Sequence, residues 1–292
     1  MPTGAASSPT PVTIATLPLE PASVAFYAKH RGFFARQGID ANLLVVAQPT
    51  QLVAAVLSHQ AQFTGLNVGS AAILKTRNAP IRLVAAGAMY RREAPTTALV
   101  AARGKGISRA RDLVGKTIAI DQKTTIAHVG LLKWLKGNGV SESDVRLVEM
   151  PFADMLGPLG RGSIDAAVLP EPYLTLATQR GAKRVAHILH AVCKQDCLLT
   201  IWMAGRDLDP ELAARFRNAI QAAAKWANRS RSDAASAAIL AQYTPIDKAV
   251  MAKMTRTRFA ERLRPASAQP WIDVYAEFGV IPTSFRAIDL VK

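Results

Sequence analysis

The sequence contains only two cysteines in 292 residues and has no long apolar run. Two cysteines exclude a small domain held together by several disulfides. The longest apolar stretches, such as residues 83–89, are far shorter than the roughly 20 residues that a membrane-spanning helix needs. Half of the residues are hydrophobic, which is enough for a sizeable core. The length predicts two domains or one large one.

Acidic residues are scarce relative to basic ones. The chain has 21 Asp and Glu against 36 Lys and Arg, which gives a formal net charge of +15. Such an excess is typical of proteins that bind nucleic acid, an anionic membrane surface or an anionic ligand, and it also keeps proteins soluble. Aromatic residues make up only 6% of the chain and do not alternate with the densest basic stretch, residues 253–264. Because that base-stacking pattern is missing, we expect no nucleic-acid partner.

The first eleven residues lack both the basic and the apolar segment of a signal peptide. They are small, polar and rich in proline, so we expect an unstructured segment over residues 1–11. Two interpretations are open: a cytosolic protein, or the mature form of an exported one.

Short β-like runs alternate with helical patterns over the first two thirds of the chain. This rhythm predicts βαβ units and parallel sheets. It starts near residue 12 and starts again near residue 117, and residues 57–67 align with residues 159–169. We interpret this as an internal repeat of two similar α/β lobes, against the alternative that any two βαβ segments look alike.

Two apolar and β-branched runs, residues 95–102 and 198–204, separate these parts. We expect them to be antiparallel strands that cross between the lobes. The predicted fold is therefore α/β, with two lobes, each a mostly parallel sheet flanked by helices, joined by two crossing strands. Lobe 1 would comprise residues 12–95 and 205–292, and lobe 2 residues 96–204 with the crossing strands. Two narrow crossings permit hinge closure over a ligand.

Several motifs of the sequence resemble those of one family. They are YAKHRGFFARQGID at residues 27–40, DLVGKTIA at residues 112–119 and EPY at residues 171–173. The chain resembles the sulfonate, nitrate and thiamine-precursor group of ABC-transporter substrate-binding proteins over residues 12–205. The resemblance implies the type II periplasmic-binding-protein architecture and a monomeric periplasmic receptor without its signal peptide. Such a receptor passes a small solute to a membrane permease.

Candidate ligand-binding residues follow the carboxyl ends of predicted strands, where ligands bind in open α/β sheets. The first turn of the next helix offers free N–H groups and a partial positive charge there. Three such junctions hold Leu17 and Pro18; Asn67, Gly69 and Ser70; and Thr124 and Thr125. Together they would bind an anionic or zwitterionic solute. The alternative for the hydroxyl residues is ordinary helix capping.

Glu171 and Tyr173 follow another strand, at the EPY motif. Glu171 would accept a hydrogen bond from the solute, or it would only stabilise the start of a helix. Tyr173 would wall the cleft or belong to the core. Asp121 is a further candidate at a strand end, and Tyr90 with its neighbouring arginines would line the cleft or lie in a solvated loop.

Catalytic and metal-binding patterns are missing from the sequence. It has no G-x-S-x-G, P-loop or G-x-G-x-x-G motif, and its five histidines show no ligand spacing. We therefore expect no enzyme activity, no metal and no cofactor. Cys193 and Cys197 would form a disulfide in the periplasm, or two buried thiols in the cytosol. The alternatives to a receptor are an enzyme similar to those of thiamine-pyrimidine synthesis, and a cytosolic ligand-sensing domain.

Overall fold

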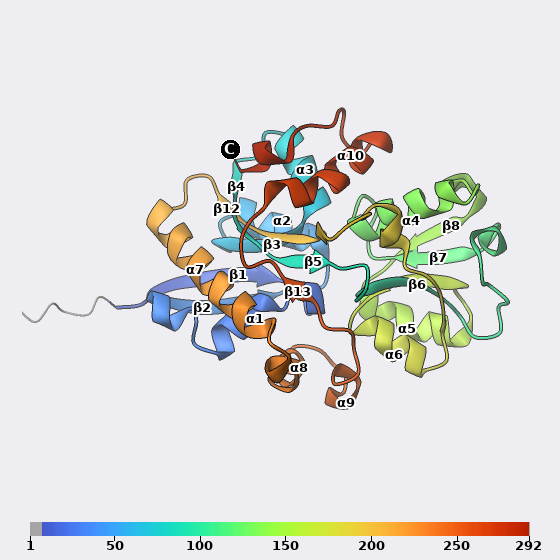
Figure 1. Ribbon diagram of the computed structural model, residues 1–292, viewed down its shortest axis with the longest axis horizontal. Coiled ribbons are helices and arrows are strands. Elements are labelled where there is room, and N and C mark those ends of the chain that lie inside the picture. The colour runs from blue at the N-terminus through green and yellow to red at the C-terminus, as the bar shows by residue number, and fades with distance from the viewer. Residues whose placement is uncertain (1–7, 292) are drawn as a thin grey trace, which may run out of the picture.

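The computed structural model describes residues 8–291, and residues 1–7 and 292 lie outside the described part. Within that range the chain forms two five-stranded sheets and one three-stranded sheet. Each large sheet is flanked by helices, so the molecule has two lobes side by side (Figure 1). The predicted two-lobed α/β architecture is confirmed.

The sheet of lobe 1 runs mostly parallel. In spatial order its strands are β2 (Ile39–Val45), β1 (Thr10–Thr16), β3 (Phe63–Asn67), β12 (Thr200–Gly205) and β4 (Ile81–Ala86). Strand β1 pairs parallel with both of its neighbours. Strand β12 pairs antiparallel with β3 and β4 and is thus inserted between them.

The sheet of lobe 2 repeats this arrangement. Its strands are β8 (Arg146–Glu149), β7 (Thr117–Ile120), β9 (Ala166–Pro170), β6 (Thr97–Ala101) and β10 (Lys183–Ala186). Here β7 is parallel to β8 and β9, and β6 is the antiparallel strand inserted between β9 and β10. The order of elements therefore matches strand for strand, as the internal repeat predicts.

The inserted strand of each lobe is reached through a crossover from the other lobe. We expected residues up to 204 to belong to lobe 2, but β12 is hydrogen-bonded on both edges within the sheet of lobe 1. Strand β6 belongs to lobe 2, as expected, so the two strands do not pair with each other. The crossings themselves are the segments before β6 and before β12.

The start of β1 corrects the expected unstructured segment. Residues 1–7 of that segment lie outside the described residues. Thr10 and Pro11 are instead the first residues of β1, where they pair with Ile39 and Asp40. Strand β2 offers a parallel edge along its whole length, and this pairing extends β1 towards the N-terminus.

Helices cover both large sheets. Lobe 1 carries α1 (Val24–His30), α2 (Pro49–Leu57), α3 (Val68–Thr76) and α7 (Pro210–Ala227). Lobe 2 carries α4 (Ile126–Gly137), α5 (Phe152–Arg161) and α6 (Tyr173–Gln179). The remaining C-terminal helices are α8 (Asp233–Leu240), α9 (Lys248–Met251) and α10 (Gln269–Glu277). The three-stranded sheet consists of β11 (Cys197–Leu198), β5 (Ala88–Tyr90) and β13 (Arg258–Phe259).

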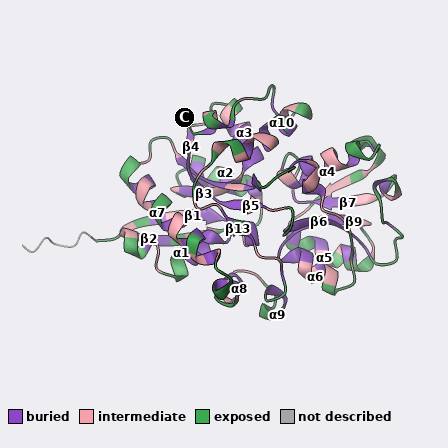
Figure 2. Ribbon diagram, viewed as in Figure 1, coloured by how far each residue is buried: buried purple, intermediate pink, exposed green. Residues whose placement is uncertain are grey.

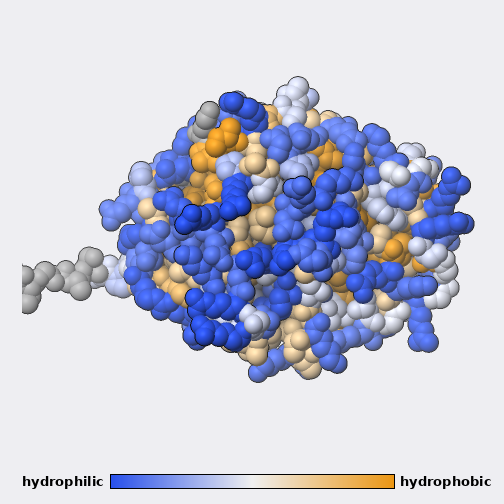
Figure 3. Space-filling view, viewed as in Figure 1, coloured by the Kyte–Doolittle hydropathy of each residue, from blue (hydrophilic) through white to orange (hydrophobic). Residues whose placement is uncertain are grey.

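Aromatic rings join the sheet of lobe 1 to helix α7. Phe63 stacks on Phe216 with ring centroids 3.8 Å apart, and Trp202 meets Phe216 edge-on at 5.7 Å. Such ring contacts stabilise a core beyond the area that they bury. Every residue of β6 and β9 is buried, because helices cover both faces of the sheet. Buried residues concentrate in the strands of both lobes (Figure 2), and hydrophilic residues cover most of the surface seen in Figure 3.

No helix within residues 8–291 has the length and the apolar composition that crossing a bilayer requires. The longest, α7, has a polar face and begins at a capped turn. The Asp209 carboxylate accepts hydrogen bonds from the backbone N–H groups of Glu211 and Leu212, at 3.1 Å each. Its first residue, Pro210, has no N–H to satisfy.

Candidate functional site

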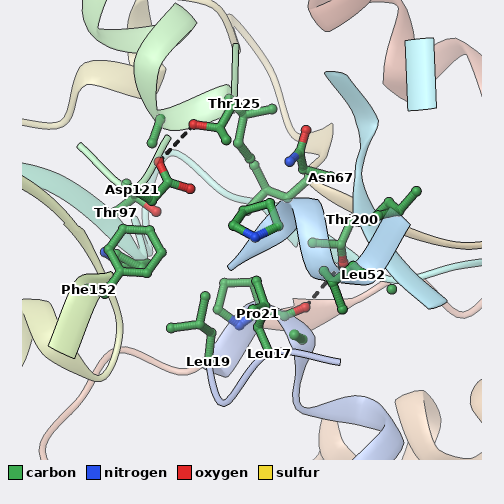
Figure 4. A pocket seen from close by; sticks show the side chains of 18 of the residues that line it. Leu17, Leu19, Pro21, Leu52, Asn67, Thr97, Asp121, Thr125, Phe152 and Thr200 are labelled. Carbon is green, nitrogen blue, oxygen red and sulfur yellow. Dashed lines mark hydrogen bonds between the residues drawn. The ribbon is translucent and has the colours of Figure 1, made fainter. Parts of the chain in front are cut away.

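A cavity of about 90 Å³ lies between the two lobes. Both lobes line it (Figure 4). Lobe 1 contributes Leu17, Leu19, Pro21, Ala22, Pro49, Leu52, Gly65, Leu66, Asn67, Leu199, Thr200 and Trp202. Lobe 2 contributes Thr97, Asp121, Thr125, Ile126, Ala127, Phe152, Pro170 and Leu189. Most of these residues are buried.

The position of the cavity follows from the direction of the parallel strands. Leu17 follows β1, Asn67 is the last residue of β3, and Asp121 follows β7. The carboxyl ends of the strands in both lobes therefore face the same space, which is where open α/β sheets bind ligands.

Apolar side chains form most of the wall. Trp202 lies across Gly65, where a Cβ atom would come within 3.1 Å of the indole ring. Any larger residue at position 65 would push the ring out of place. On the side of lobe 2, Phe152 stands at the start of α5, with the Tyr173 ring stacked behind it at 6.3 Å. Tyr173 therefore supports the wall from outside and does not line the cavity.

The polar side chains in the wall make internal hydrogen bonds. The Thr200 hydroxyl donates to the carbonyl of Pro21 at 3.1 Å and accepts from the N–H of Ala88 at 2.7 Å. Asn67 caps α3, because its side-chain oxygen accepts from the N–H of Ser70 at 2.8 Å. The N-cap of α3 is thus Asn67 and not Ser70, for which we had considered capping, and the Asn67 amide still borders the cavity.

Asp121 is the acidic residue of the cavity. It is 7% exposed, and its Oδ1 accepts a hydrogen bond from the Thr125 hydroxyl at 2.8 Å. Burial raises the pKa of the Asp121 carboxyl to about 6, against the lowering effect of the hydrogen bond from Thr125. Within the described residues, no lysine, arginine or histidine lines the cavity.

Three of the ten predicted ligand-binding residues line the cavity: Leu17, Asn67 and Thr125. Pro18 and Ser70 are not in its wall. Gly69 lies under Tyr275 of α10, whose ring atoms would be 1.9 Å from a Cβ atom there. The missing side chain of Gly69 therefore allows α10 to pack on α3. This role is structural and does not involve a ligand.

Thr124 and Tyr90 also lie outside the wall. The carbonyl of Thr124, a residue with a φ of +64°, accepts a hydrogen bond from the Tyr275 hydroxyl at 2.7 Å. Tyr90 is fully buried in β5 and contacts the ring of His190 at 5.7 Å. The Arg92 guanidinium donates to the carbonyls of His190 and Cys193, so it does not face the cavity either. Cys193 itself is bonded to Cys197, with Cα atoms 5.7 Å apart.

Glu171 lies outside the cavity in a contact between the lobes. It is 2% exposed, and its carboxylate accepts from the N–H and the hydroxyl of Thr175 at 3.0 and 2.9 Å. A third hydrogen bond comes from the N–H of Thr255 at 3.2 Å. Burial raises the pKa of Glu171. Its carboxylate is thus committed to protein partners and not to a solute.

The same C-terminal segment binds a second buried carboxylate, in lobe 1. The N–H of Thr257 donates to Glu20 at 3.0 Å, and the Arg256 guanidinium lies 3.2 Å from the Glu20 carboxylate. Tyr27 also donates to Glu20, at 3.0 Å. We call residues 255–257 the clasp, because they connect Glu171 of lobe 2 to Glu20 of lobe 1.

Sequence reasoning missed most of the apolar wall and several further residues, among them Leu52, Thr97, Phe152, Thr200 and Trp202. Phe152 begins the helix that follows β8, so the rule of strand ends would have found it. Thr97, Thr200 and Trp202 lie on the two inserted antiparallel strands, whose place in the sheets no sequence pattern reveals.

Within residues 8–291 no group of three or more histidine, cysteine, aspartate or glutamate side chains is close enough to hold a metal ion. The wall of the cavity also contains no serine, cysteine, histidine or lysine among the described residues. The arrangement is therefore suited to enclosing a small solute in an apolar space with one carboxylate.

Solved structures with the same fold cover nearly the whole chain. The ligand-binding component of an ABC-type import system from Staphylococcus aureus, with zinc bound, is 14% identical, with a TM-score of 0.80 over 97% of this chain and 96% of that chain. The alkanesulfonate-binding protein SsuA from Xanthomonas axonopodis pv. citri, bound to MOPS, is 19% identical, with a TM-score of 0.78 over 98% and 99%. The desulfurization enzyme DSZB is 16% identical, with a TM-score of 0.70 over 97% and 96%.

No curated protein matches the chain significantly. A family profile does: the one described as NMT1/THI5 like matches residues 22–234, well over half of the chain. The protein therefore belongs to the NMT1/THI5-like family.

Proposed function

We propose that the protein is the solute-binding receptor of an ABC importer. It captures a small solute between its lobes, closes over it as a monomer and presents the closed form to a membrane permease in the periplasm. The observation that carries this proposal is the cavity between the lobes, whose wall comes from both of them at the carboxyl ends of their strands. The ABC-import and sulfonate-binding proteins with the same fold support it.

The solute leaves the receptor chemically unchanged. Among the described residues that line the cavity, Asp121 is the one ionisable group, and none offers a serine, cysteine or lysine nucleophile. An enzyme with the same fold is known in DSZB. Mass spectrometry of the solute before and after incubation with the protein therefore separates a receptor from an enzyme.

The test is a thermal-shift screen of small cationic, zwitterionic, neutral and anionic solutes, followed by small-angle scattering with each solute that stabilises the protein. A ligand at a hundred times its dissociation constant stabilises by about 2.7 kcal/mol, which the screen resolves. We expect the radius of gyration to fall on binding. No stabilisation by any class, or binding with an unchanged radius of gyration, would contradict the proposal.

A matched pair of variants on α2 controls this test. Leu52 is buried in the cavity wall, whereas Leu57 on the same helix is 40% exposed. We expect Leu52→Trp to fill the cavity and to abolish both binding and compaction, and Leu57→Trp to retain both. Far-ultraviolet circular dichroism of the two variants checks that each remains folded.

A further inference from the structure

The charge of the cavity is opposite to that of the whole molecule. The chain has a net charge of +15, yet Asp121 is the one ionisable side chain among the described residues of the wall. The other lining residues are apolar, apart from Asn67 and three threonines. A solute that fits this wall has an apolar body and a polar group that meets a carboxylate.

Asp121 is placed to meet such a group. One of its oxygens accepts the hydrogen bond from Thr125, and the other points away from Thr125 towards the middle of the cavity (Figure 4). The carboxylate is more than nine-tenths buried, so water does not solvate it well. A buried carboxylate without a counter-ion is unfavourable, and a cation beside it relieves that cost.

The usual anion site at the start of a helix is already taken by the protein itself. Thr125 is the N-cap of α4, and its hydroxyl binds Asp121. The positive end of α4 therefore already meets a carboxylate. An anionic solute would lie next to a like charge. Arg92, for which we considered both the cleft and a solvated loop, is bound to carbonyls elsewhere.

The groups around Asp121 do not supply a positive counter-ion. Glu149 of β8 adds a negative charge, and Tyr275 of α10 faces the carboxylate as a neutral phenol. On α4, His128 has a lowered pKa because of burial and lies 3.4 Å from Glu142. Lys123 does not line the cavity, and its backbone N–H donates to the Glu149 carboxylate at 2.9 Å.

We propose that the solute carries a positively charged nitrogen, an ammonium or amidinium group, which pairs with Asp121 while its apolar body contacts Trp202 and Phe152. This inference rests on the proposed receptor function. Organic cations and zwitterions share the ammonium group, and the probes below distinguish them.

The experiment measures binding of four probes that share a five-carbon chain: pentylamine, 5-aminopentanoate, 1-pentanol and pentanoate. We expect the better of the two amines to bind at least tenfold more tightly than pentanol or pentanoate at pH 7.5. Tighter binding of 5-aminopentanoate than of pentylamine identifies a zwitterion as the solute, and the reverse identifies an organic cation.

A matched pair of variants tests whether Asp121 is the partner. Asp121→Asn should weaken binding of the amine at least tenfold and leave pentanol unaffected. Asp40→Asn removes the same charge from exposed Asp40 on β2, outside the cavity, and should leave every probe unaffected.

The pH dependence supplies a second measurement that needs no variant. Because the amine binds the ionised carboxylate, its affinity should fall roughly tenfold for each pH unit below about 6. The affinity for pentanol should not follow this course, which separates Asp121 from the titration of His128.

Three results would overturn the inference: pentanol or pentanoate binding as tightly as the amines, neither amine binding, or Asp121→Asn binding the amine like the wild type. If Asp121→Asn does not fold, the pH dependence replaces it as the test. An amine affinity that stays constant from pH 7.5 to 5 would then overturn the inference. Binding and compaction with pentanol or pentanoate would overturn this inference and leave the receptor function standing. The receptor function fails when the wider screen finds no solute of any class, or when the solutes that bind leave the radius of gyration unchanged.

Discussion

At the scale of single residues, Gly69 shows why a position at a strand end need not bind ligand. A Cβ atom there would overlap the Tyr275 ring, whose hydroxyl is hydrogen-bonded to Thr124 of lobe 2. The absence of a side chain at position 69 thus lets α10 of the C-terminal segment reach both lobes.

We predict that Gly69→Ala lowers the free energy of unfolding by roughly 1–3 kcal/mol, because overpacking displaces Tyr275 from Thr124. Gly160→Ala on α5 is the matched control, since nothing lies within 4 Å of a Cβ atom at that position. It should be neutral or slightly stabilising, because alanine favours a helix interior over glycine. Urea unfolding measures both, and equal stabilities of the two variants would contradict the prediction.

Asp121 and Glu171 show that a single sequence predicts the position of a carboxylate at a strand end but not its partners. Both follow buried strands and both precede helices, so the sequence predicts the same role for them. In the structure, Asp121 borders the cavity, whereas Glu171 is turned towards Thr175 and the clasp. The difference arises from a segment more than 80 residues away, which no local pattern contains.

At the scale of elements, the clasp is a segment of the C-terminal region that binds a buried carboxylate in each lobe. It consists of three consecutive residues, and its charged member, Arg256, lies between the Tyr27 hydroxyl at 2.9 Å and the fully buried Glu20. Removing one partner of such a pair leaves the other charge buried and unpaired.

We predict that Arg256→Met destabilises the protein by about 3–5 kcal/mol at pH 7, the usual cost of breaking a buried ion pair. The loss should shrink as the pH falls. The pKa of Glu20 is already raised by burial, and without Arg256 it rises further, so the carboxyl is protonated and neutral at a higher pH. Chemical unfolding at pH 7 and pH 5 measures the loss.

Exposed Arg258, two residues beyond Arg256 on β13, provides the control for this prediction. Arg258→Met should cost well under 1 kcal/mol, because exposed charges contribute little. A loss for Arg256→Met that is as small as this control, or that grows on acidification, would contradict the role assigned to the clasp.

At the scale of the whole molecule, much of the fold was accessible from the sequence. The alternation of strands and helices predicts two α/β lobes, and the repeat predicts their common strand order. The carboxyl ends of β1, β3 and β7 follow from the topology alone, which is why Leu17, Asn67 and Asp121 could be named. The inserted strands could not be placed, because an apolar run such as that of β12 fits any buried position in a sheet. Trp202 was therefore missed.

The two lobes differ in how their strands are distributed along the chain. All five strands of lobe 2 lie between residues 97 and 186, whereas β12 of lobe 1 comes more than 100 residues after its neighbours. We predict that a fragment of residues 95–192 folds cooperatively and that a fragment of residues 8–95 does not. Amide hydrogen exchange of both fragments measures this, and protection in the shorter fragment alone would contradict it.

This distribution sets an order of events during synthesis. A ribosome releases domains from the N-terminus onwards, so the first-made part of a protein is usually the first to become ordered. Here the sheet of lobe 1 stays incomplete between β3 and β4 until β12 has been synthesised. We expect the later-made lobe 2 to be assembled by then, so that the early strands β1 and β3 are among the last elements to reach their final surroundings.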